Sequence, residues 1–273
     1  MKISYSKYSA FLANPERYRL QHVLGLSPEG EDTPTFMNLG RRRGRCFHAL
    51  LEGRKTETLD RDALVQEYSL DLVERCERMA AVVPDLGDFL LTEAAFTIPI
   101  GDGKHSISGR LDHIYGGTPF RVGDFKTTKG TRTKKELQEY LAEMETSSQA
   151  HFYLKAAATL GYPTNLFTYH VILDRKNKDS APTYFPMDLR PEENGPAAVE
   201  RTMLGVYAAC EAIEFLRKTY GEEKPWPHSN NWPCCGDKFF CGYSGICGRA
   251  IPKGCAPAGF TYRWAEQLKS EAE

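Results

Sequence analysis

Two aspartates and a lysine stand where two neighbouring strands would bring them together. Asp112 lies in the run Gly109-Arg110-Leu111-Asp112-His113-Ile114, and after a turn at Gly116-Gly117 the run Val122-Gly123-Asp124-Phe125-Lys126 follows. If the runs pair as a hairpin, both carboxylates can lie on one face near one end, and the strand period puts Lys126 beside Asp124. Converging carboxylates suit Mg²⁺ or Mn²⁺, and a lysine beside such an ion can orient water or stabilise charge on a phosphate. From the spacing alone, ordinary strand-end aspartates and an exposed lysine are the better explanation.

Other groups that could do chemistry surround this pair in the sequence. His48 follows the basic run Arg41-Arg42-Arg43-Gly44-Arg45 on one predicted helix, so we expect Arg41, Arg42 and Arg45 to contact phosphate as readily as to form a solvated face. The same expectation holds for Lys129 and Arg132, which come directly after the Asp-x-Lys run. Glu93 heads the first predicted strand and could approach the metal, but we interpret it as a strand-edge residue. The sequence has no Gly-x-x-x-x-Gly-Lys-(Ser/Thr) loop, which excludes a P-loop motor within the chain.

The elements that must position these groups can be read from the hydrophobic pattern. Residues 94–100, 106–115 and 120–125 are partly alternating runs separated by glycine-rich turns, which predicts a three-stranded antiparallel meander. Helices are predicted around it, and two more strands after it; the helices cover 6–25 (bent), 35–52, 60–83, 147–160 and 196–220, and the strands 166–173 and 183–187. This order predicts one mixed α/β core with helical additions.

Length, composition and charge place the chain among ordinary globular proteins. It has 273 residues, with 41% hydrophobic and 26% charged, which excludes a disordered or collagen-like chain. The net charge of −1 gives no global sign of a polyanionic partner. Neither a secretory signal nor a membrane span is visible, so we expect a cytoplasmic protein with no membrane partner.

The motifs together resemble those of a known family. Asp112 followed by Asp124-Phe125-Lys126 is similar to the Asp…(Asp/Glu)-x-Lys signature of the PD-(D/E)XK nuclease superfamily. Three more features resemble its RecB-like exonuclease branch and fall in family order between residues 4 and 247. They are Gly44-Arg45-Cys46-Phe47-His48-Ala49-Leu50-Leu51-Glu52 (Gly-x-x-x-His-x-x-Leu-Glu), Gln149-Ala150-His151-Phe152-Tyr153 (Gln-x-x-x-Tyr), and an N-terminal helix followed by Asn14-Pro15-Glu16-Arg17-Tyr18, similar to a Cys-Pro-x-x-(Phe/Tyr) element.

The resemblance implies a fold and a set of roles. The fold is a restriction-endonuclease-like α/β core, a mixed sheet flanked by helices, in a single domain over 1–273: a helical part at 1–90, the catalytic core at 91–220 and a Cys-rich tail at 221–273 that packs on the core. His48, Asp112, Asp124 and the Phe125 carbonyl would bind Mg²⁺ or Mn²⁺. Lys126 would be the catalytic lysine, and Gln149 and Tyr153 would face the nucleic acid or the lysine.

The function implied by the resemblance is that of a metal-dependent DNA exonuclease, a phosphodiester hydrolase acting on single-stranded or duplex ends. Its setting would be DNA repair, recombination, or phage- or CRISPR-related processing, beside a helicase, a recombinase or a CRISPR adaptation protein. The resemblance alone also implies that a bacterium or a phage encodes the protein. The alternative is a catalytically weak module that grips nucleic-acid ends and docks a partner protein.

The C-terminal cysteines need an explanation of their own. Cys234, Cys235, Cys241, Cys247 and Cys255 lie within 22 residues, which is dense for reduced thiols that only pack. Cys235, Cys241 and Cys247 resemble the C-terminal trio that holds an iron–sulfur cluster in AddB-type and CRISPR-associated exonucleases. The N-terminal cysteine of that family element is Asn14 here, so Cys255 or Cys234 would supply the fourth thiolate. Zinc in place of the cluster, or no metal at all, stays open.

Overall fold

The structure is a computed structural model that describes residues 1–28, 36–55, 57–129, 134–174, 181–227, 243, 246–252, 255–258 and 260–262. The chain forms two units. The first comprises Met1–Thr35, Pro99–Ser108 and Met203–Glu273, and the second comprises Phe36–Ile98 and Gly109–Thr202. All the candidate catalytic residues lie in the second unit. Within the described part of the chain, no helix is both long and apolar enough to cross a membrane.

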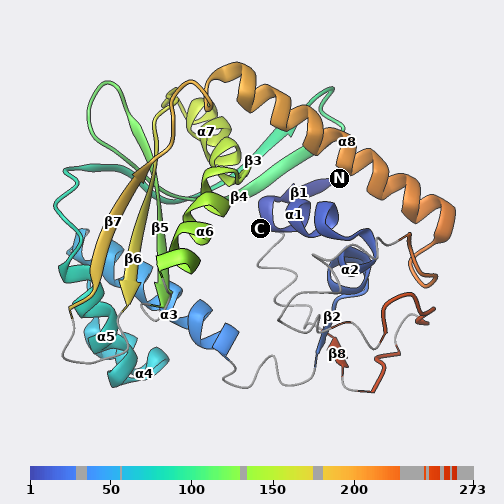
Figure 1. Cartoon of the computed structure of the whole chain (residues 1–273), viewed down its shortest axis with the longest axis horizontal. Coiled ribbons are helices and arrows are strands. Elements are labelled where there is room, and N and C mark those ends of the chain that lie inside the picture. The colour runs from blue at the N-terminus through green and yellow to red at the C-terminus, as the bar shows by residue number, and fades with distance from the viewer. Residues whose placement is uncertain are drawn as a thin grey trace. The chain divides into compact units, whose positions relative to one another are not determined.

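A mixed sheet forms the centre of the second unit (Figure 1). Its strands are β3 (Phe89–Ile100), β4 (His105–Tyr115), β5 (Arg121–Lys129), β6 (Phe167–Asp174) and β7 (Thr183–Asp188). The order is β4-β5-β6-β7, with β3 paired to β4; β4 and β5 are antiparallel, β5 and β6 are parallel, and β6 and β7 are antiparallel. All eight residues of β6 are buried, as expected for a strand covered on both faces. The predicted mixed α/β core is confirmed.

The ladder between β4 and β5 ends where the two aspartates begin. It pairs Tyr115 with Arg121 and runs only as far as His113 and Gly123, so continuing the register would set Asp112 opposite Asp124. A Cβ at Gly123 would lie 2.0 Å from Nε2 of His113, so only glycine lets the two strands approach here. Beyond this pair β5 continues along β6 alone, and the carboxylates face the gap.

Three helices pack on one face of this sheet: α3 (Phe36–Lys55), α4 (Arg61–Tyr68) and α5 (Leu70–Ala81). The core on this side consists of apolar residues from α3 and α5 with Phe125 and Ile172, including Cys46, Phe47, Leu50, Val73, Cys76 and Met79. The single helix predicted over 60–83 is wrong. Ser69 has a left-handed φ of +83°, which breaks the helical hydrogen-bond pattern between α4 and α5.

Helices α6 (Lys134–Glu145) and α7 (Gln149–Thr159) lie beside β5 in Figure 1. More than half of the residues of α7 are buried, among them Phe152 and Tyr153. The sequence analysis did not predict α6, although Leu137, Tyr140, Leu141 and Met144 have the spacing of an amphipathic helix.

The first unit joins the N-terminal helices to the C-terminal segment. It contains β1 (Lys2–Ser4), α1 (Tyr5–Ala13), α2 (Pro15–Tyr18), the π-helical turn η1 (Arg19–Val23), β2 (Leu26–Pro28), α8 (Pro196–Tyr220) from Met203 onward, and β8 (Phe260–Tyr262). Strand β1 pairs in parallel with Ser106–Ser108 of β4, and β2 pairs with β8. Asn14 caps α2: its Oδ1 accepts from the N–H groups of Glu16 at 2.8 Å and Arg17 at 3.1 Å.

Candidate metal centre

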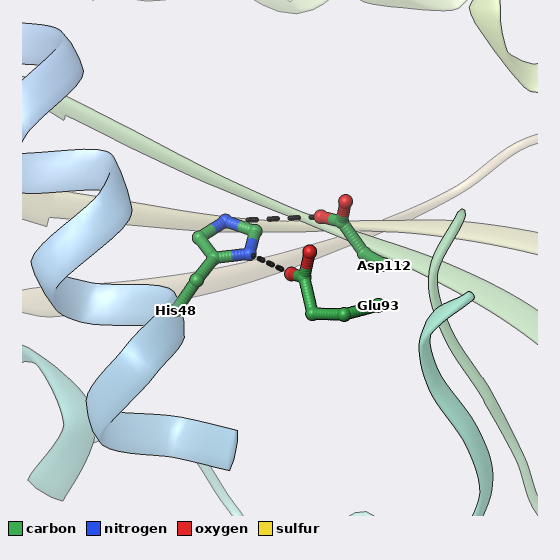
Figure 2. Close-up of side chains that lie close together, drawn as sticks. All are labelled: His48, Glu93 and Asp112. Atoms are coloured by element: carbon green, nitrogen blue, oxygen red, sulfur yellow. Dashed lines mark hydrogen bonds and ion pairs between the residues drawn. The ribbon is translucent and has the colours of Figure 1, made fainter. Parts of the chain in front are cut away.

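His48 is held between two carboxylates. The ring of Phe47 packs edge-on against Phe125 with centroids 5.7 Å apart, which fixes the face of α3 that His48 presents. Nδ1 of His48 lies 3.0 Å from Oε1 of Glu93, and its Nε2 lies 3.8 Å from Oδ2 of Asp112 (Figure 2). All three side chains are largely buried. Three elements, α3, β3 and β4, therefore converge on one imidazole.

Glu93 reaches this position through an unusual backbone conformation. Its φ is +46°, a left-handed value in the middle of β3 that costs a non-glycine residue on the order of 1–3 kcal/mol. Such conformations persist where the surroundings determine them, and they gather at functional sites. We interpreted Glu93 as a strand-edge residue; the structure places it beside His48 instead. Only its position heading a strand before Asp112 hinted at this, because a positive φ cannot be read from an alternating pattern.

The two aspartates predicted from the hairpin are neighbours. Oδ2 of Asp112 accepts a hydrogen bond from the N–H of Phe125 at 3.0 Å, which ties the end of β4 to β5 across the gap. Burial and the charge of Asp124 raise the pKa of Asp112 well above its usual range. Oδ2 of Asp124 is buried and accepts no hydrogen bond of regular geometry among the described residues. The proximity of the two carboxylates therefore favours a proton on Asp112.

Lys126 provides the nearest ammonium group. Its Nζ lies 2.6 Å from Oδ2 of Asp124 and 5.9 Å from the centre of the Tyr169 ring. Burial would lower the pKa of Lys126, but the charges of Asp124 and Asp112 raise it above its usual value. The lysine is therefore a fixed positive charge at neutral pH.

The pKa of His48 is also set by its neighbours. Burial would lower it, but the hydrogen bond with Glu93 and the charge of Asp112 raise it to about 9. The imidazole would have to be neutral to bind a metal ion, because a protonated ring nitrogen has no lone pair to offer. A cation at this position would therefore displace a proton.

Gln149 and Tyr153 contact each other on α7. Nε2 of Gln149 donates to Oη of Tyr153 at 3.1 Å, as their spacing of one helical turn allows. Burial and the charges of Asp124 and Asp112 raise the pKa of Tyr153 well above its usual range, so its hydroxyl keeps its proton.

A small cavity opens beside His48. Its volume is about 20 Å³, and its walls include Leu51, Glu52, Phe89, Glu93, Asp112 and His113. That volume is room for a single water molecule. It is too small for a nucleotide.

The donor set fits a divalent metal ion. The ligand atoms of His48, Glu93 and Asp112 all lie within 4.8 Å of one another, so small side-chain rotations would bring them to a common ion. One imidazole nitrogen with carboxylate oxygens suits Mn²⁺ or Mg²⁺. Asp124 lies outside this group and would join it by turning its buried carboxylate from Lys126. The predicted ligand atom of Phe125 is its carbonyl oxygen. The contacts of Phe125 in the structure are those of its N–H, which donates to Asp112, and of its ring, which packs edge-on against His48.

A second group of side chains that could ligate a metal ion is already paired with a lysine. His105, Glu211 and Glu214 also lie within 4.8 Å of one another. Nζ of Lys104 is 2.6 Å from Glu211 and 3.0 Å from Glu214, so an ammonium group already occupies the position between their carboxylates.

The predicted phosphate-binding residues are only partly described. Arg42 is exposed and donates to the carbonyl of Glu67 on α4 at 3.1 Å, and Arg45 is exposed on α3. Arg41 belongs to α3 and Lys129 ends β5, but their side chains, like the whole of Arg132, lie outside the described residues. Of the predicted set, only the side chains of Arg42 and Arg45 are therefore described, and both are exposed on α3.

The predicted cluster ligands are described only in part. Cys235 and Cys241 lie outside the described residues; Cys247 is half-buried and Cys255 is exposed. Within the described ranges, no cysteine joins a group that could hold a metal ion. Asn14 is buried and its side chain caps α2, so it has a structural task in place of a thiolate.

Comparisons with known proteins identify the family and the fold of the chain. The family model of the PD-(D/E)XK nuclease superfamily matches residues 2–248. The crystal structure of a "Putative exonuclease" from Eubacterium rectale aligns over 93% of this chain and 91% of its own, with 14% identity and a TM-score of 0.54, and so shows the same fold. A structure of the protein SSO0001 aligns over 92% of this chain and 88% of its own, with 16% identity and a TM-score of 0.38, which is too low to support an argument. No protein with curated function matches the sequence.

Proposed function

Because the chain belongs to the PD-(D/E)XK nuclease superfamily, we propose that it is a Mg²⁺- or Mn²⁺-dependent DNA exonuclease that hydrolyses phosphodiester bonds. The observation that carries the proposal is the convergence of His48, Glu93 and Asp112 beside the Asp124–Lys126 pair. A phosphodiester is an anion with a poor leaving group, so its hydrolysis needs positive charge and an activated water. The site offers ligands for a metal ion that would supply both, and a charged lysine that would add to the positive charge.

His48, Asp112 and Glu93 would hold the ion, and Asp124 would complete the set after releasing Lys126. The bound ion would supply a water of lowered pKa and would neutralise charge on the phosphate. In the structure Glu93 pairs with Nδ1 of His48 while Nε2 faces Asp112, so Glu93 would ligate an ion on Nε2 only after leaving Nδ1. Phe125 fixes Asp112 through its N–H.

Lys126 would act on the phosphate itself. Its ammonium stays charged and lies 2.6 Å from Asp124, on the face shared by both residues. Once Asp124 turns to the ion, the ammonium would be free to pair with the negative charge that develops on the phosphate oxygens. Tyr153, protonated and bonded to Gln149, offers a neutral hydroxyl.

The finer parts of the function are part of the same proposal. We propose that the substrate is a DNA end, that the setting is repair, recombination or phage- or CRISPR-related processing in the cytoplasm, and that a helicase, recombinase or CRISPR adaptation protein is the partner. An iron–sulfur cluster or zinc in the tail is supported only by the density of its cysteines.

The test is cleavage of end-labelled oligonucleotides, single- and double-stranded, DNA and RNA, with Mn²⁺ or with EDTA. Wild type should shorten DNA from an end only with the metal. Asp124→Asn should lower the rate by about 10²–10³-fold or more, because it removes a charge from the ion and the partner of Lys126.

The matched control is Asp188→Asn. Asp188 ends β7 of the same sheet and is 64% exposed in its ion pair with Arg121, so it should leave the rate unchanged. Binding of DNA ends by wild type without any cleavage would favour the end-binding module. Equal cleavage by wild type and Asp124→Asn would overturn the assignment of the site.

A further inference from the structure

Arg110 is the one exposed residue of β4. The strand is otherwise buried or half-buried from His105 to Tyr115, whereas the side chain of Arg110 is 66% exposed. It stands two residues before Asp112, so the alternation of the strand points both side chains to the same face. Leu111 between them is fully buried on the other face. An arginine is thus displayed on the open side of the candidate metal centre.

The guanidinium of Arg110 lies close to the candidate metal centre but forms no hydrogen bond with its described residues. Nη1 of Arg110 lies 3.6 Å from Oε2 of Glu93, and the other oxygen of Glu93 lies 3.0 Å from Nδ1 of His48. At 3.6 Å this is an ion pair too long for a hydrogen bond. The structure gives Arg110 no hydrogen bond within the described part of the chain, so its donors remain available to a ligand.

When a phosphate binds, its negative charge needs a further positive charge at the site. Glu93, Asp112 and Asp124 contribute three negative charges, and a bound divalent ion with Lys126 would balance them. A phosphodiester then brings one more negative charge to a site with no surplus of positive charge. Arg110 supplies that surplus, and its planar fork of N–H donors matches two phosphate oxygens.

We propose that Arg110 binds a phosphate of the nucleic-acid strand next to the bond that is cut. This inference rests on the proposed nuclease function and adds to it a substrate-binding residue outside the metal ligands and the lysine. Arg110 exchanges its loose contact with Glu93 for the phosphate when the strand binds. Because the contact is with the backbone, it favours no base.

The experiment measures binding of a fluorescein-labelled single-stranded DNA by anisotropy, with Ca²⁺ present and under conditions where a gel shows the strand intact. Arg110→Ala should bind about tenfold more weakly at roughly 0.1 M salt. The slope of log affinity against log salt should fall by about 0.7, which is the loss of one phosphate contact on a single strand. Arg110→Lys should restore the slope, because an ammonium also pairs with phosphate.

The matched control is Arg190→Ala. Arg190 is 65% exposed and pairs with Glu193 at 3.2 Å, so it resembles Arg110 in exposure and pairing but lies in the turn after β7. Its loss should leave the slope unchanged. Calorimetry should find the same Mn²⁺ affinity in Arg110→Ala as in wild type. This result would show that Arg110 binds phosphate and does not act by positioning Glu93 for the metal ion.

Four outcomes would overturn the inference. An unchanged slope in Arg110→Ala, or an equal loss in Arg190→Ala, would overturn the phosphate contact while wild-type cleavage leaves the nuclease function standing. Weakened Mn²⁺ binding in Arg110→Ala would make Arg110 a support of Glu93. A wild-type chain that binds no oligonucleotide would overturn both proposals.

Discussion

The imidazole of His48 is the site's exchangeable proton carrier. Glu93 and Asp112 raise its pKa to about 9 against the effect of burial, so the ring holds a proton near neutral pH. A pKa raised above its ordinary value means that the proton is favoured below about pH 9 and lost above it. The same two carboxylates that would bind a metal ion therefore also favour the proton on His48, which competes with the ion for the ring nitrogen.

We expect Mn²⁺ binding to release the proton of His48. The apparent affinity should rise with pH, by up to about tenfold per unit, and level off as the pH passes about 9. Isothermal titration calorimetry in two buffers of different ionisation enthalpy measures the protons released at about pH 7.

The control is His48→Gln, which keeps a polar side chain beside Glu93 but has no titrating ring. It should bind Mn²⁺ more weakly and release about one proton fewer than wild type. The comparison is needed because the pKa of Asp112 is raised too and its proton can also leave. Equal proton release from both proteins would show that His48 is not the group displaced.

At this scale the sequence predicts residue types better than it predicts their orientation. Asp112, Asp124 and Lys126 follow from strand alternation around a hairpin, and His48 follows only from its motif. Glu93 was interpreted as a strand-edge residue, because its place beside His48 depends on a left-handed φ that alternation cannot reveal. The positions of Gln149 and Tyr153 on one face of a helix follow from their spacing alone.

Among the elements, α3 is held to the sheet by a buried arginine. Arg43 lies one helical turn before Phe47, and its guanidinium donates to Oδ2 of Asp174 at 3.0 Å and to the carbonyl of Thr127 at 3.4 Å. Arg75 of α5 reaches the same oxygen of Asp174 at 2.7 Å. The ends of β5 and β6 thus hold both helices in place. Because His48 belongs to α3, these contacts also fix its position along the sheet.

We expect Asp174→Asn to damage the centre from a distance. Asp174 is 3% exposed, and replacing its carboxylate leaves a buried guanidinium without a counter-charge, which typically costs about 3–5 kcal/mol of unfolding free energy. Because α3 would then move relative to β4, Mn²⁺ affinity should fall as well. Urea unfolding and calorimetry measure the two effects.

Arg75→Ala is the control for Asp174→Asn. Arg75 is 34% exposed, so water can replace it at Asp174, while Arg43 keeps its partner and α3 its place. It should lose less stability and keep its Mn²⁺ affinity. If Asp174→Asn lost stability yet bound Mn²⁺ as wild type does, the anchor would stabilise the fold without setting the position of His48.

Elements with a strong period are predictable, and short or interrupted ones are not. The hairpin of β4 and β5, the buried β6 and helix α7 follow from their patterns. The break at Ser69 is a single backbone angle within a continuous amphipathic pattern. Strands β1, β2 and β8 have three residues each, too few to show a period, and their partners are distant in sequence.

For the whole chain, the first unit shows how a tail rich in proline and glycine is fixed. Glu16 and Arg19 are fully buried and form a pair with two contacts, at 2.6 and 2.7 Å. Glu16 also accepts from the N–H of Trp226 at 2.7 Å and that of Gly248 at 3.3 Å, while Arg19 donates to three carbonyls, of Glu222, Glu223 and Arg249. No local pattern predicts this, because the partners are more than 200 residues apart.

We expect this pair to resist replacement by apolar residues. Arg19→Met should cost about 3–5 kcal/mol of unfolding free energy, because Glu16 is left buried without a counter-charge.

In many proteins the double replacement of a buried pair recovers such a loss. Here Glu16→Leu with Arg19→Met should stay destabilised, since two N–H groups and three carbonyls of the tail would lose their partners. Urea unfolding followed by tryptophan fluorescence measures both, with Arg61→Ala, at a half-exposed surface pair with Glu77, as the control of little effect. A double variant as stable as wild type would mean that other contacts hold the tail.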